Sequence, residues 1–340
     1  MKTETVAVIS DRPGRSRTAT TAHAVQLLRK GEVVALPTET VYGLAADALN
    51  PAAVAKIFEA KERPRFDPLI LHLPSEDWLE RVARIDRDSR ATIKKLTTQF
   101  WPGPLTLILD RQPIVPGIVT AGLDTVAVRI SSHPVFTEVI SAFGEPLAAP
   151  SANRFGRVSP TTAQHVFDEL RGRVPLIIDA GPTAHGIESS IIAVQGSRIE
   201  MLRLGPITAE QLAEFGNIHS GTAPEKVYAP GQLPSHYAPK TSLRLIDNSE
   251  TFALPANYRV GLLAWNASIP EERFAAVRTL SERQDLREAA SNLFRCLREL
   301  DELGLDLIVA ERVPAQGIGA AILDRLKRAS HDSEIRGTHE

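Results

Sequence analysis

Short strand-like segments alternate with helical segments through the first 215 residues, and this alternation constrains the fold more than any other feature. Strands are predicted over the apolar runs 5–9, 33–36, 69–73, 105–109, 126–130, 176–179, 190–194 and 198–202. Helices are predicted at 20–30, 52–60, 86–98, 134–143, 162–170 and 208–215. Several strands follow one another without a helix between them, which favours a mixed sheet over a purely parallel one.

The pattern changes after residue 215. From 216 to 241 the periodicity fails and prolines and glycines recur, which predicts an interdomain linker. A linker of this length suggests a further role, and we expect it to act as a lid. Residues 242–340 then read as a smaller α/β unit, with strands at 260–265 and 305–310 around an apolar helical stripe. The expected domains are therefore 1–215, 216–241 and 242–340.

Composition excludes several classes of protein. The net charge is −2 and the chain contains one cysteine, Cys296. An intramolecular disulfide or a cysteine-based metal cluster is therefore excluded, and no strongly basic surface for nucleic acid is expected. The apolar runs are far shorter than the roughly 20 residues of a membrane span. We expect a soluble, cytoplasmic protein without a membrane partner.

Residues suited to binding anions follow the predicted strands and helices. The run Pro37–Leu44 leaves an apolar strand and supplies hydroxyls and a glycine, where α/β proteins expose backbone N–H groups to ligands. Lys61 and Arg63 follow a predicted helix and offer a point charge and a planar fork, which suit a polyphosphate. Both are expected to be loop residues on the surface of a cleft.

Common nucleotide and hydrolase signatures are absent from the sequence. It has no Gly-Lys pair, hence no P-loop, and no Gly-x-Ser-x-Gly elbow. Its histidines lack the spacing of a metal site. What remains is a dispersed set at or near predicted strand ends, which converge at one edge of a sheet. Its members are Thr40, Lys61, Arg63, His72, Arg129, Ser151, Asn153, Ser189 and Arg203.

At these residues the chain resembles the threonylcarbamoyl-adenylate synthases, the YrdC-like family, in their longer two-domain form. The matching blocks of the first domain are Pro37–Leu44, Lys61-x-Arg63-Pro64 with Pro68, Leu69 and His72, Ala149–Asn153, Gly186-x-Glu188-Ser189 and Leu202-Arg203-x-Gly205. The later blocks are His236-Tyr237-Ala238-Pro239 and Gly317-x-Gly319-Ala320-Ala321-Ile322 with Arg325-Leu326. The resemblance covers nearly the whole chain.

The resemblance implies both a fold and an activity. The implied fold is a YrdC-like α/β domain with a twisted mixed sheet and helices, plus a smaller Rossmann-like α/β C-terminal domain. The implied enzyme is a nucleotidyltransferase that converts L-threonine, bicarbonate and ATP into threonylcarbamoyl-AMP and pyrophosphate. Mg²⁺ would accompany ATP, with no tightly bound protein metal site. A downstream tRNA threonylcarbamoyl transferase complex would use the product to make threonylcarbamoyladenosine, and tRNA contact would be at most transient.

The resemblance also assigns roles to individual residues. The catalytic group is Lys61, Arg63, Ser151 and Asn153. The ATP-binding group contains these four with Asp67, Thr125, Ser159, Arg203, His236 and Tyr237. The L-threonine group is Thr40, His72, Arg129 and Ser189, with Arg129 facing the substrate carboxylate.

The chain departs from the family pattern at several positions, and two alternative functions remain open. Asp67 stands where asparagine is common, so a carboxylate would lie near triphosphate unless magnesium intervenes. Glu62 stands where glycine is common. One alternative is a double-stranded RNA or tRNA-binding module without catalysis. The other is a carbamoyl-transfer enzyme like the hydrogenase maturation proteins, whose extra domains this chain lacks.

Overall fold

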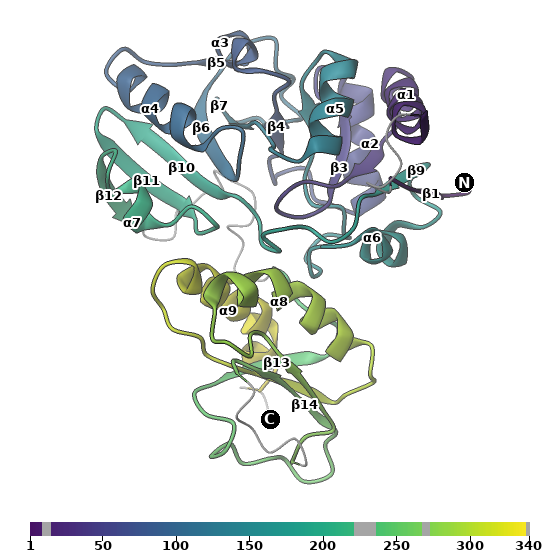
Figure 1. Cartoon of the computed structure of the whole chain (residues 1–340), viewed down its shortest axis with the longest axis vertical. Coiled ribbons are helices and arrows are strands. Elements are labelled where there is room, and N and C mark those ends of the chain that lie inside the picture. Colours follow the sequence, from purple (N-terminus) through teal and green to yellow (C-terminus); the bar gives the residue numbers. More distant parts are fainter. Residues whose placement is uncertain (9–14, 221–235, 267–272, 338–340) are drawn as a thin grey trace. The chain divides into compact units, whose positions relative to one another are not determined.

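The chain divides into two compact units, each with its own sheet (Figure 1). The computed structural model describes residues 1–8, 15–220, 236–266 and 273–337. The first unit is formed mainly by residues before 220. The second is formed by residues after 236 together with Gly156–Ser159 and His185–Ile187. Most of the predicted linker or lid, residues 221–235, lies outside the described residues.

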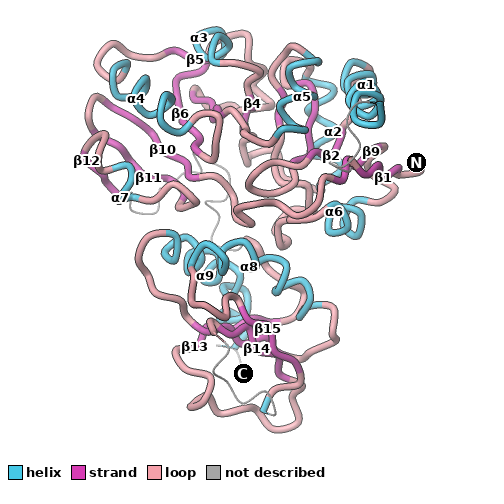
Figure 2. The backbone as a smooth tube through the Cα atoms, viewed as in Figure 1, coloured by secondary structure: helices cyan, strands magenta, loops and turns pink. Residues whose placement is uncertain are grey.

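The first unit is built on a twelve-stranded mixed sheet (Figure 2). In spatial order its strands are β1 (Glu4–Ala7), β9 (Leu176–Asp179), β2 (Val34–Leu36), β3 (Gly43–Asp47), β8 (Leu147–Ala148), β4 (Ile70–His72), β7 (Thr125–Arg129), β6 (Leu105–Arg111), β10 (Ser190–Gln195), β11 (Arg198–Arg203) and β12 (Asn217–Ser220), and β5 (Ala83–Arg84) pairs with β6. Parallel pairs such as β4 with β7 occur beside antiparallel pairs such as β2 with β3. The mixed sheet predicted from the sequence is confirmed.

Helices cover both faces of this sheet. They are α1 (Arg15–Arg29), α2 (Pro51–Lys61), α3 (Leu79–Val82), α4 (Arg90–Phe100), α5 (Pro134–Phe143), α6 (Ala163–Leu170) and α7 (Ala209–Leu212), with the 3₁₀ turn η1 (Glu76–Trp78). Successive residues of β2 point to opposite faces. Val34 therefore joins a core cluster with Leu28 of α1 and Phe136 of α5, whereas Ala35 joins the cluster that contains Ile57 of α2.

The ends of α2 are fixed by local sequence, and its last residue is Lys61. The Asn50 side chain accepts hydrogen bonds from two N–H groups of the first turn, and Pro51 occupies the first helical position. Glu62 ends the helix with a positive φ of 54°. This left-handed conformation explains why a glycine suits the position. The Arg63 N–H then donates to the Phe58 carbonyl oxygen at 2.9 Å, which turns the chain sharply after Lys61.

The second unit is a parallel four-stranded sheet with two long helices. Its strands, in spatial order, are β13 (Ser242–Ile246), β16 (Leu307–Glu311), β14 (Val260–Ala264) and β15 (Ala276–Thr279). The helices are α8 (Leu286–Asp301) and α9 (Ile318–Gly337). The predicted stripe of α8 is buried, as Leu293 and Leu297 show. A Cβ atom on Gly319 would lie 1.9 Å from the Pro314 carbonyl oxygen, so tight packing accounts for that glycine.

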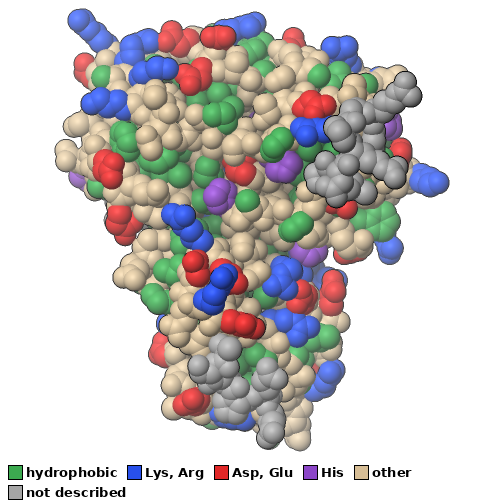
Figure 3. Space-filling view, in the orientation of Figure 1, with side chains coloured by type: hydrophobic (Ala, Val, Ile, Leu, Met, Phe, Trp, Pro, Cys, Tyr) green, Lys and Arg blue, Asp and Glu red, His purple; other side chains and the backbone are tan. Residues whose placement is uncertain are grey.

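Basic and acidic groups are interspersed on the face that Figure 3 shows, without a large patch of one sign. No helix in the described part of the chain is long and apolar enough to cross a membrane.

Candidate active site

Three sequence blocks that are far apart in the chain meet at the end of α2. The Lys61 ammonium donates hydrogen bonds to the carbonyl oxygens of Ser151, at 2.5 Å, and of Asn153. The backbone N–H of Leu44, in the block after β2, donates to the Pro150 carbonyl oxygen at 2.8 Å. Burial lowers the pKa of Lys61 well below its ordinary value, and its side chain is 1% exposed. The charge of Arg63 lowers this pKa further, and the charges of Asp67 and Glu169 act in the opposite direction.

A cluster of cations surrounds the buried carboxylate of Asp67. Arg63 pairs with this carboxylate at 2.8 Å and donates to the carbonyl oxygens of Asp67 and Pro68. Burial raises the pKa of Asp67, and the charges of Arg63, Lys61 and Arg203 oppose the rise. Three cations around one carboxylate leave positive charge for an incoming polyphosphate. The structure thus brings together four residues of the ATP-binding group.

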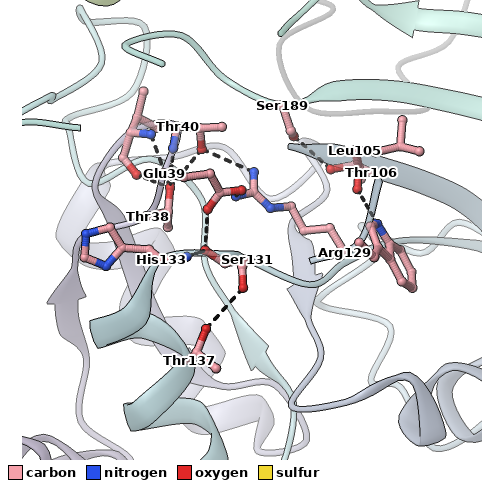
Figure 4. A network of polar contacts seen from close by, with 12 residues as sticks. Thr38, Glu39, Thr40, Leu105, Thr106, Arg129, Ser131, His133, Thr137 and Ser189 are labelled. Atoms are coloured by element: carbon pink, nitrogen blue, oxygen red, sulfur yellow. Dashed lines mark hydrogen bonds and ion pairs between the residues drawn. The ribbon is translucent and has the colours of Figure 1, made fainter. Parts of the chain in front are cut away.

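Arg129 lies at the centre of a second polar network (Figure 4). It ends β7, is 2% exposed, and donates from Nη2 to the Glu39 carboxylate at 2.6 Å. Its Nη1 donates to the Thr40 hydroxyl at 3.2 Å, and Thr40 lies 2.8 Å from the Thr38 hydroxyl. The second carboxylate oxygen of Glu39 accepts from the Ser131 hydroxyl. Among the described residues, Arg129 Nε has no hydrogen-bond partner, so this donor is left unpaired.

His72 lies beside Arg129 because β4 and β7 pair in parallel with these two residues in register. The imidazole is 3% exposed, and its ring centroid lies 4.6 Å from that of Phe136. Burial lowers the pKa of His72 well below its ordinary value, and the Arg129 charge lowers it further. A backbone hydrogen bond with Ala149 acts in the opposite direction. At neutral pH the ring is therefore neutral, and its Nδ1 has no partner within the described residues.

The depressed pKa of His72 predicts a loss of stability in mild acid. In the unfolded chain His72 takes up a proton near pH 6.5, whereas in the folded protein it stays neutral at that pH. The contribution of neutral His72 to stability is therefore present above pH 6.5 and is lost as the pH falls below it. We expect the free energy of unfolding to fall by about 1 kcal/mol from pH 6.5 to 5.5 for one such group. In urea unfolding at pH 7.5, 6.5 and 5.5, the free energy of unfolding of His72→Gln should depend less on pH than that of wild type. An equal pH dependence in the two proteins would contradict the lowered pKa of His72.

Arg203 links the cation cluster to Ser189. It ends β11 and donates from Nη2 to the Ser189 hydroxyl and from Nε to the Ser189 carbonyl oxygen, both at 3.0 Å. The Ser189 hydroxyl also lies 2.8 Å from the Thr106 hydroxyl (Figure 4). The charge of Arg203 also lowers the pKa of Asp67, against the rise caused by burial. On the other side, Thr106 precedes Leu107, which is the register partner of Val128 on β7, the strand that Arg129 ends. Ser189 and Thr106 therefore connect the cation cluster to the strand that carries Arg129.

Thr125 lies away from these residues along its strand. It begins β7, whereas Arg129 ends the same strand four residues later. Its register partner on β6 is Asp110, at the end of the β6–β7 pair that is far from Arg129. The structure therefore does not bring Thr125 beside the cluster around Arg129.

Three residues assigned to ATP belong to the second unit. They are Ser159, His236 and Tyr237. The Tyr237 ring is 1% exposed and stacks on Phe294 of α8, with centroids 5.6 Å apart. The backbone N–H of Ala238 donates to the Gly156 carbonyl oxygen at 2.9 Å. The His236-Tyr237 block is thus packed within its own unit.

The structure corrects expectations about two site residues and adds residues that the sequence analysis did not assign. Arg63 follows α2 as expected but is buried, so its expected surface position is wrong. Lys61 is the last residue of α2 and is fully buried, so both its expected loop position and its expected surface position are wrong. Its burial follows from the two carbonyl groups that enclose the ammonium. Glu39, Ser131 and Thr106 were given no role. Thr106 has a recognisable signal, since it is the lone hydroxyl within the apolar strand 105–109.

Comparisons with known proteins agree with this geometry. The Sua5/YciO/YrdC family model, described as "Telomere recombination", matches residues 26–205, and a model for the "Threonylcarbamoyl-AMP synthase, C-terminal domain" matches residues 207–331. A Bacillus subtilis protein named threonylcarbamoyl-AMP synthase is 42% identical over 93% of this chain and 94% of its own length. A Pyrococcus abyssi protein of the same name is 38% identical over 90% of this chain and 93% of its own.

A solved structure extends the likeness to three dimensions. The crystal structure of P. abyssi Sua5 complexed with L-threonine superimposes with a TM-score of 0.85 at 35% identity, and covers 96% of this chain and 98% of that one. Both sequence and fold therefore match along almost the whole length. The chain belongs to the Sua5/YciO/YrdC family.

Proposed function

We propose that this protein is an L-threonylcarbamoyladenylate synthase, which converts L-threonine, bicarbonate and ATP into threonylcarbamoyl-AMP and pyrophosphate. One observation carries the proposal. A cluster of three cations suited to phosphates lies near a buried arginine suited to a carboxylate: Arg203 donates to Ser189 at 3.0 Å, and the Ser189 hydroxyl contacts Thr106 on the strand that pairs with the strand of Arg129. Relatives that match both domains carry the same name.

The two parts of the site divide the substrates between them. Lys61, Arg63 and Arg203 would hold the phosphates, with Ser151 and Asn153 supplying hydroxyl and amide contacts. The assignment of Thr125 and Ser159 to ATP stays a prediction from the resemblance. The Arg129 fork would take the threonine carboxylate, because its Nε edge has no partner in the described part of the chain. Thr40, His72 and Ser189 would hold the threonine amine and hydroxyl.

The reaction needs no covalent enzyme nucleophile. The free amine of threonine and bicarbonate give a carbamate and water, and a carbamate oxygen then attacks the α-phosphorus of ATP while pyrophosphate leaves. The protein must hold several anions together and stabilise the charge that moves to the leaving group. Positioning and electrostatic stabilisation therefore supply most of the rate enhancement.

Magnesium would enter with ATP. Mg²⁺ is usually held by one or two carboxylates together with phosphate oxygens and water. Asp67 fits this use because its carboxylate is buried, lies among the phosphate-binding cations and makes no hydrogen bond within the described residues besides its ion pair with Arg63. When bound, the ion would neutralise phosphate charge. Asp67 would hold the ion in place. The repulsion expected between this carboxylate and the triphosphate would then be removed, because the ion would lie between them.

Pyrophosphate release tests the proposal directly. Release should require both L-threonine and bicarbonate, because the carbamate is the attacking group. A coupled pyrophosphate assay with each substrate omitted in turn checks this, and mass spectrometry should detect threonylcarbamoyl-AMP. Equally fast release without bicarbonate would exclude the mechanism.

We infer that the product leaves for a separate transferase that modifies tRNA in the cytoplasm. The alternative of an RNA-binding module is less well supported, since charges of both signs are interspersed on the visible surface in Figure 3 and the net charge is −2. A module that binds through phosphates needs a basic surface and shows a steep salt dependence. Contact with tRNA would therefore be transient.

A further inference from the structure

Glu39 is the one acidic side chain in the Arg129 network of Figure 4, and it has no role in the reaction described above. It is 6% exposed and pairs with a guanidinium that is itself 2% exposed. A buried carboxylate without a partner is strongly unfavourable, so this pair forms a single unit. Arg129 of this pair is the group proposed to bind the substrate carboxylate.

Hydrogen-bond directions fix the orientation of this pair. The Ser131 hydroxyl accepts from the His133 N–H at 3.3 Å and donates its proton to Glu39. Glu39 then accepts from Arg129 Nη2, and Thr40 accepts from Nη1. Both terminal nitrogens of the fork are thereby held, which sets the direction of the remaining Nε edge. Glu39 thus positions the group that would bind the substrate.

Charge distinguishes this part of the site from the phosphate part. Around Asp67 three cations face one buried carboxylate, and Glu169 is a further acidic neighbour of Lys61, so positive charge remains in excess. Around Arg129 the Glu39 carboxylate balances the guanidinium, so that pair is neutral. A neutral pair attracts a free anion only weakly, and it suits a zwitterion, which itself carries no net charge.

We propose that Glu39 is a positioning residue that also sets specificity: it orients Arg129 and neutralises it, so that the subsite takes a zwitterionic amino acid and rejects free anions such as phosphate. This inference rests on the proposed function, because it assumes that Arg129 faces the threonine carboxylate. It explains how a site that contains four cations keeps its amino-acid part free of phosphates, which bind in the other part.

The variant Glu39→Gln tests the inference, since it preserves shape and an acceptor but removes the charge. Calorimetric titration should show that threonine binds about tenfold more weakly or worse, while inorganic phosphate becomes a competitor of threonine. ATP affinity should stay within about twofold. Ser131→Ala is the matched control: it loosens Glu39 without changing charge, so threonine should bind more weakly and phosphate should not compete.

The outcomes separate this inference from the proposed function. If wild-type protein fails to bind threonine, the proposed function fails first. If wild type binds threonine and Glu39→Gln binds threonine and phosphate as wild type does, Glu39 has no such role. If Glu39→Gln does not fold, Glu39→Asp and Ser131→Ala test the inference instead. Each of these variants should weaken threonine binding about fivefold or more and leave ATP binding unchanged. Unchanged threonine binding in both would overturn the inference.

Discussion

Replacing Lys61 with alanine should lower turnover by about two to three orders of magnitude, the usual effect of removing one charge-stabilising group from a catalytic site. The ammonium supports the site in two ways. It supplies positive charge beside Arg63 and Asp67, and it holds the carbonyl groups of Ser151 and Asn153 in place. Pyrophosphate release at saturating ATP and threonine measures the loss.

The same substitution should also reduce stability, because it leaves two buried carbonyl groups without their donor. The expected loss is about 1–3 kcal/mol in denaturant unfolding. Lys56→Ala is a matched control on the same helix: its ammonium pairs with Glu32 at 2.8 Å with both side chains partly exposed, so activity should not change and stability should change by less than about 1 kcal/mol. Turnover within fivefold of wild type in a destabilised Lys61→Ala would make this lysine purely structural.

Elements with strong local signals could be predicted from the sequence. α5 spans Pro134–Phe143, as predicted, because the His133 side chain caps its start and Gly144 ends it with a φ of 87°. The mixed sheet also follows from consecutive strands without helices. In contrast, β8 has two residues, and β12 lies where glycines and prolines predicted a linker. Such short strands exist because neighbours in the sheet pair with them, and periodicity over so few residues carries no signal.

The sequence singles out candidate site residues but not the contacts that they make in the fold. Motif residues such as Lys61 and Arg129 could be singled out because charged groups follow strands and helices. Their burial could not, since it depends on carbonyl groups some 90 residues away for Lys61 and on Glu39, also about 90 residues away, for Arg129. Long-range hydrogen bonds of this kind leave no periodic trace in the sequence, which explains why Glu39 and Thr106 received no role.

Arg129→Ala should weaken threonine binding by about 100-fold or more, since the buried, charge-assisted contact proposed between its Nε edge and the substrate carboxylate would be lost. It also leaves the Glu39 carboxylate buried without its partner, which repels the substrate carboxylate. ATP affinity should change by less than about threefold, because the phosphates meet other cations. Separate calorimetric titrations with threonine and with ATP measure the two effects. Arg129→Lys should lie between wild type and alanine, because it keeps the charge and loses the fork.

Stability has to be separated from binding in this variant, since breaking a buried ion pair costs about 3–5 kcal/mol. The double replacement Arg129→Met with Glu39→Leu removes both charges and should recover much of that loss, because well-packed apolar groups can replace a buried pair. The double variant should still fail to bind threonine, although its stability is largely restored. Arg90→Ala, which breaks an exposed pair with Glu80, should change neither property. If threonine and ATP weaken equally in Arg129→Ala, or if the double variant binds threonine, the carboxylate of the substrate lies elsewhere.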